Sequence, residues 1–106
     1  MLFSLLLASA QPVFDQRRCP VVAMDAINIA EARRAGATEG QVLNVVLEHA
    51  ANNNQNDRQA ALEAYRAGSA LVRYVYETNA NGIISPQGLG RLVYASCFSS
   101  GTLPQP

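Results

Sequence analysis

Few residue types in this chain can carry chemistry, and the most informative are its two cysteines. Cys19 and Cys97 lie near opposite ends of the 106-residue chain, so they cannot form a Cys-x-x-Cys redox or zinc motif. In a small exported protein, two cysteines most simply form one structural disulfide. That bond closes a loop of about 79 residues and stabilises the fold by roughly 4.5 kcal/mol in the chain-entropy model. Two free, buried thiols are the alternative.

The other reactive side chains do not assemble into a recognisable catalytic or metal-binding motif. The single histidine, His49, has no nucleophile elbow or other ordered triad motif to accompany it. Glu48 and Asp57 do not complete a zinc site with His49, because zinc needs three or four ligands at recognisable spacing. The glycines match no phosphate-binding pattern. We therefore expect no enzyme activity, no catalytic residue, no metal site and no cofactor, and we expect His49 to be partly buried on the apolar side of a helix.

The charge balance also excludes classes of function. Eight basic residues, all of them arginine, balance eight acidic ones, and charged residues make up 15% of the chain. A neutral chain without a basic cluster is not expected to bind nucleic acid, because that affinity rests on neutralising phosphates. The hydrophobic share of 49% is large enough to build a folded core.

The first ten residues are typical of a secretory signal. An apolar stretch, Leu2 to Leu7, precedes Ala8-Ser9-Ala10, a small-residue pattern that signal peptidase accepts. We predict a signal segment over 1–10 and a periplasmic or secreted product. The alternative is the first helix of a cytosolic protein. No other apolar run approaches the ~18 residues of a membrane span, so the processed chain is not expected to be an integral membrane protein.

Four helices are predicted between the cysteines. Pro20 suits the first position of one helix, and Gly36 suits the residue after its end. Thr38 and Gln41 have the spacing of a capping box. Side chains at positions 57 and 85 are further candidate N-caps. The expected helices are 20–34, 39–50, 58–78 and 86–97.

The helix over 58–78 presents a broad apolar surface with one residue out of register. Tyr65 and Tyr76 fall on its apolar stripes, whereas Tyr74 falls on the polar side, which also carries Arg66 and Arg73. Tyrosine and arginine are common anchors of protein interfaces. Arg66, Arg73 and Tyr74 are therefore the candidate partner-binding residues. The alternative is that Tyr74 lies along arginine stems or against a neighbouring helix.

We expect an all-α fold: a small four-helix up-down bundle closed by one disulfide. Short loops favour antiparallel neighbours, and an even number of such helices brings Cys19 and Cys97 to the same end. The domain should cover 11–98, and a tail over 99–106, without periodicity, is expected to be disordered.

Several short motifs add a resemblance to a group of exported proteins. They are a cysteine before the first helix, Ala32-Arg33-x-x-Gly36, Val75-Tyr76 and Tyr94-x-x-Cys97. In these the chain resembles small exported two-cysteine helical proteins of proteobacteria, a group without an established activity. The resemblance implies the location and the helical fold, and it carries over no functional residue.

The expected function is non-enzymatic. We expect an exported interaction protein, such as an inhibitor or immunity-type factor with a protein partner in the cell envelope. The alternative is a small carrier or chaperone that holds an apolar ligand or client between its helices.

Overall fold

The fold is built from helices alone over the described part of the chain. The computed structural model describes residues 12–104. A 3₁₀ turn, η1 (Gln16–Arg18), leads into α2 (Cys19–Arg34), α3 (Glu39–Asn53), α4 (Arg58–Thr78) and α5 (Pro86–Ser100), and no strand occurs within 12–104. The predicted all-α class is confirmed. The predicted signal segment, 1–10, lies outside the described residues.

Local capping chemistry explains where the helices begin. The Asp57 carboxylate accepts a hydrogen bond from the Ala60 N–H at 3.0 Å, and the Ser85 hydroxyl accepts one from the Gly88 N–H at 3.0 Å. Thr38 and Gln41 make both bonds of the predicted capping box, at 2.9 and 3.2 Å. These bonds pair backbone groups that the first turn of a helix leaves without a partner.

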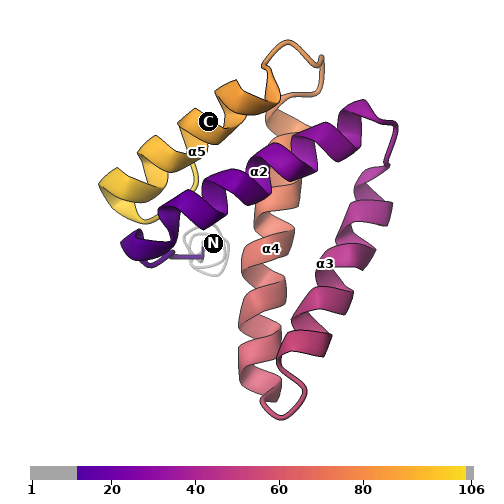
Figure 1. Cartoon of the computed structure of the whole chain (residues 1–106), viewed down its shortest axis with the longest axis vertical. Helices are drawn as coiled ribbons and strands as arrows, with labels where there is room; N and C mark the ends of the chain where they lie inside the picture. Colours follow the sequence, from indigo (N-terminus) through magenta and orange to yellow (C-terminus); the bar gives the residue numbers. More distant parts are fainter. Residues whose placement is uncertain (1–11, 105–106) are drawn as a thin grey trace, which may run out of the picture.

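The helices associate as two pairs. In Figure 1, α2 runs beside α5 in the opposite direction, α3 and α4 form an antiparallel hairpin, and α2 crosses the hairpin. The regular up-down bundle that we expected is not established, because the two pairs cross instead of sharing one axis. Crossed pairs bury less of each helix than a bundle does. Consequently the buried residues of α4 are confined to its second half: Leu71, Val72 and Val75.

The core lies where α2, α5 and the second half of α4 meet. Its largest side chains without exposed surface are Val72, Val75, Leu89 and Val93. Close approach requires small residues at two crossings. A Cβ at Gly90 would lie 2.7 Å from the Ile27 side chain, and one at Gly68 would lie 2.5 Å from Val46 Cγ1. Gly68 therefore lets α3 and α4 approach each other closely.

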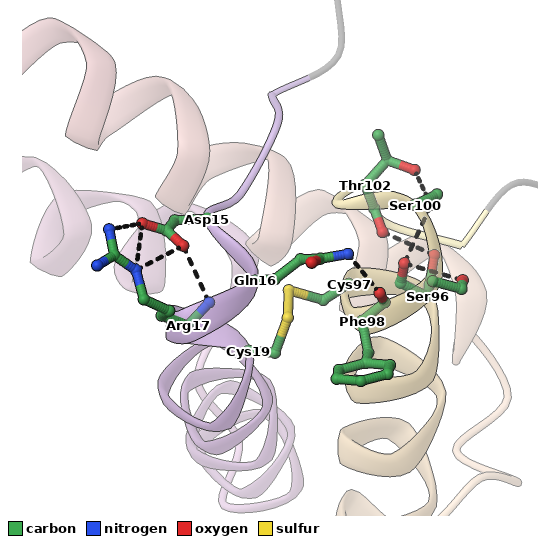
Figure 2. The surroundings of a disulfide bond; sticks show 10 residues. Asp15, Gln16, Arg17, Cys19, Ser96, Cys97, Phe98, Ser100 and Thr102 are labelled. Carbon is green, nitrogen blue, oxygen red and sulfur yellow. Dashed lines mark hydrogen bonds and ion pairs between the residues drawn. A yellow bond between two sulfur atoms is a disulfide. The ribbon is translucent and has the colours of Figure 1, made fainter.

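The predicted pairing of Cys19 with Cys97 is confirmed. Figure 2 shows the bond joining the start of α2 to the last turn of α5, and both residues are fully buried. Gln16, just before Cys19, donates a hydrogen bond from Nε2 to the Phe98 carbonyl at 2.7 Å. The covalent link and this bond fix the same end of the helix pair.

The chain after Cys97 differs from the expected disordered tail as far as residue 104. α5 continues to Ser100, and Gly101 ends it with a left-handed φ of 72°. The Gly101 carbonyl then accepts a hydrogen bond from the Phe14 N–H at 2.6 Å, and Leu103 is buried in the core. One apolar residue among polar ones gives no periodicity, so the sequence pattern does not reveal its burial. The burial of Leu103 and the hydrogen bond between Phe14 and Gly101 together hold this segment against the domain.

Arg33 links several elements at the end of α2 that is distant from the disulfide. Its guanidinium donates hydrogen bonds to the Asn79 carbonyl and, at 2.9 Å, to the Ala80 carbonyl, which follow α4. It also lies over the Tyr76 ring, 5.3 Å from the centroid, and the Tyr76 hydroxyl donates to the Ala37 carbonyl at 2.6 Å. The ends of α2 and α4 and the α2–α3 loop are thereby joined.

Tyr76→Phe is expected to lower the free energy of unfolding by about 1 kcal/mol. The substitution removes one hydrogen bond and leaves the ring in place under Arg33. Urea denaturation measures the change. Tyr65→Phe is the matched control, because the Tyr65 hydroxyl makes no hydrogen bond within 12–104 and its loss should leave the midpoint unchanged. Equal effects of the two substitutions would contradict the role given to the Tyr76 hydroxyl.

Candidate functional site

An apolar groove of about 530 Å³ lies between α2, α3 and α4. Valines of α3 at helical spacing, Val42, Val45 and Val46, form one wall. Ile29 and Ala32 of α2 are among the residues opposite. Small or apolar residues of α4 form the floor: Ala64, Gly68 and Leu71.

The groove stays open because its walls carry too little side-chain volume to fill it. Ala64 is small and exposed, and Val45 leaves 52% of its surface exposed. Within residues 12–104, no further helix covers the first half of α4 from that side, since α5 packs along α2. An exposed apolar surface in a concave site is typical of ligand-binding pockets, which usually enclose about 300–1,000 Å³.

Polar residues from two helices also line the groove. Asp25 and Asn28 come from α2, Gln41, His49 and Asn53 come from α3, and Asn54 follows α3. Asn54 also donates a hydrogen bond from Nδ2 to the Ala50 carbonyl at 2.9 Å. A second hollow, of about 560 Å³, adjoins the groove. The two share Asp25, Asn53 and Asn54 as well as Ala64, Gly68 and Leu71 of α4, and these shared residues form the boundary between them.

Asp25 is the charged group of this boundary. Partial burial raises the pKa of its carboxyl, and electrostatic interactions with Arg18 and His49 act in the opposite direction. Desolvation is the largest of these effects. The carboxylate thus lies beside apolar surface while it is still open to solvent.

The structure separates the three candidate partner-binding residues. Arg66 and Arg73 are exposed on α4, as expected. Tyr74 is half-buried and packs against the core, so the prediction of an exposed tyrosine on the polar face is corrected. Burial raises the pKa of the Tyr74 phenol, which a hydrogen bond with Thr78 partly opposes. The second half of α4 is enclosed over a wider arc than one stripe, because Tyr74 and Tyr76 both contact the core.

The sequence did not predict the positions of two residues that line the groove, His49 and Asp25. His49 is exposed at the groove instead of partly buried, because the apolar side of α3 faces an open space. Asp25 belongs to no motif of the sequence, so no role is predicted for it. A single carboxylate on a helix does not indicate which residues of neighbouring helices will lie near it.

Three further observations concern metal binding, membrane-spanning helices and exposed aromatic rings. Between residues 12 and 104, no group of three or more His, Cys, Asp or Glu side chains could hold a metal ion. Over the same residues, no helix is both long and apolar enough to cross a membrane. The exposed rings of Tyr94 and Phe98 stack on α5, with centroids 6.2 Å apart.

Comparisons with known proteins found no relative of this chain: no protein-family model, curated protein or solved structure matches it.

Proposed function

We propose that the chain is a non-enzymatic, exported binding protein that holds an apolar ligand in the groove between α2, α3 and α4. It would act as a small carrier or chaperone in the periplasm or outside the cell. The observation that carries the proposal is the groove itself, about 530 Å³ in volume and lined mainly by apolar side chains. Leaving such a surface open to water costs stability, which a bound apolar molecule recovers.

The disulfide supports the proposed location. Structural disulfides form and persist in oxidising compartments, and the Cys19–Cys97 bond is fully buried. The apolar stretch over 2–7 and the small residues after it, typical of an export signal, agree with this.

An uncharged fluorescent probe tests the groove. N-phenylnaphthylamine should bind the folded protein with saturable fluorescence enhancement, and Ala64→Leu should weaken binding about 10-fold. The reason is that Ala64 lies exposed in the lining, so a leucine there occupies ligand space without disturbing the core. Ala51→Leu is the matched control, an exposed alanine on α3 outside the groove lining, and it should leave binding unchanged.

A failure of this test would favour the competing proposal. That proposal is recognition of an envelope protein through the polar face of α4, and it keeps Arg66 and Arg73 but has lost Tyr74 as an exposed anchor. No saturable probe binding, or equal loss in both leucine variants, would contradict the carrier proposal.

A further inference from the structure

Asp25 is a negative charge without a close basic partner. Salt bridges within 4.0 Å in the described part of the chain are limited to the one between Asp15 and Arg17. Arg18 and His49 influence the Asp25 carboxyl only through their charge. Asp25 is solvent-exposed and lines the groove, so a positive charge placed beside it there would be attracted to its carboxylate.

The groups around Asp25 come from each element that packs near it. η1 contributes Arg18 and α3 contributes His49. α4 contributes Glu63, which lines the neighbouring hollow together with Asp25. Asn53 and Asn54 add uncharged amides at the same boundary. The position therefore combines an unpaired carboxylate with polar groups, next to an apolar channel.

Building on the proposed function, we infer that the groove takes a small amphiphile with a positively charged head group. The apolar body lies between the valines of α3 and Ile29 of α2, and the head group pairs with the Asp25 carboxylate. Asn53 and Asn54 surround the head from α3 and the loop that follows it.

Charge complementarity favours a cationic head group over an anionic or an uncharged one. An anionic head would lie against the Asp25 carboxylate, and like charges at close range repel. An uncharged head would cover part of the exposed Asp25 carboxylate without supplying an opposite charge. The volume of about 530 Å³ suits one small molecule with a short apolar chain.

Three probes with the same tail separate the contributions. Decyltrimethylammonium, decanol and decyl sulfate are titrated into the intact protein by calorimetry at neutral pH, below any micelle formation. The quaternary head keeps its charge at every pH, so a difference reports on the protein. The cation should bind about 5-fold more tightly than decanol, the upper range for a partly exposed ion pair. Decyl sulfate should bind more weakly than decanol.

Variants assign the preference to one carboxylate. Asp25→Asn should abolish the advantage of the cation over decanol while leaving decanol binding unchanged. Glu31→Gln, an equal loss of charge on an exposed position of α2 outside the groove, should keep the advantage. A cation preference that survives Asp25→Asn would overturn the inference.

The probes also distinguish the two proposals. If decanol binds in the groove and the cation binds no better, the inference fails and the carrier proposal stands. If neither N-phenylnaphthylamine nor any of these three probes binds saturably, the carrier proposal itself fails. The comparison among wild-type titrations does not depend on any variant folding.

Discussion

Reducing the Cys19–Cys97 disulfide is expected to lower the melting temperature by more than about 10 °C. The bond joins residues 78 positions apart, so its loss frees a long loop in the unfolded chain. Allowing for native strain, the cost is about 3–4 kcal/mol, and a domain of this size shifts by several degrees for each kcal/mol. Circular dichroism melts with and without reductant measure the shift.

The Cys19→Ala, Cys97→Ala double variant is the control for the reductant. It should melt at the reduced protein's temperature and should not respond to reductant. Thiol labelling of the folded, oxidised protein should find no reactive cysteine, since both sulfurs are buried in the bond. An unchanged melting temperature in a sample whose thiols label fully after reduction would refute this structural role.

Asn79→Ala is expected to cost about 2–3 kcal/mol, a large effect for a residue in a turn. Asn79 is only 7% exposed, and its amide closes the α4–α5 connection against Ile84. Nδ2 donates to the Ile84 carbonyl at 2.7 Å, and the Ile84 N–H donates to Oδ1 at 2.9 Å. Alanine leaves both backbone groups without those partners in a partly buried site, where an unmade hydrogen bond is expensive. Urea denaturation provides the measurement.

Asn81→Ala is the matched control in the same connection. Asn81 is exposed, so its replacement should change the free energy of unfolding by no more than about 0.5 kcal/mol. Comparable losses in the two variants would contradict the specific role given to the Asn79 amide in this turn.

The helices and their caps were predictable because they depend on neighbours in sequence. A cap needs one oxygen and an N–H three residues later, so Asp57 and Ser85 could be recognised directly. The bounds of α4 followed from the same reasoning. The cysteine pairing was also accessible, because only two cysteines are present.

The arrangement of the helices was less accessible because it depends on contacts between distant residues. A helical-wheel projection of α4 describes that helix alone. It therefore could not show that other helices enclose the second half of α4, where Tyr74 packs against the core. In the same way, the groove exists because α2 lies across the α3–α4 hairpin. Asp25 and His49 gain their positions from that crossing.

The disulfide has a topological consequence as well as an energetic one. All four described helices lie between Cys19 and Cys97 or contain one of them, so the backbone from one cysteine to the other forms a covalent ring. A single proteolytic cut in the exposed loop between α3 and α4 opens that ring without releasing a fragment. The two pieces stay linked through α2 and α5, so a nicked molecule keeps its full covalent assembly until the bond is reduced.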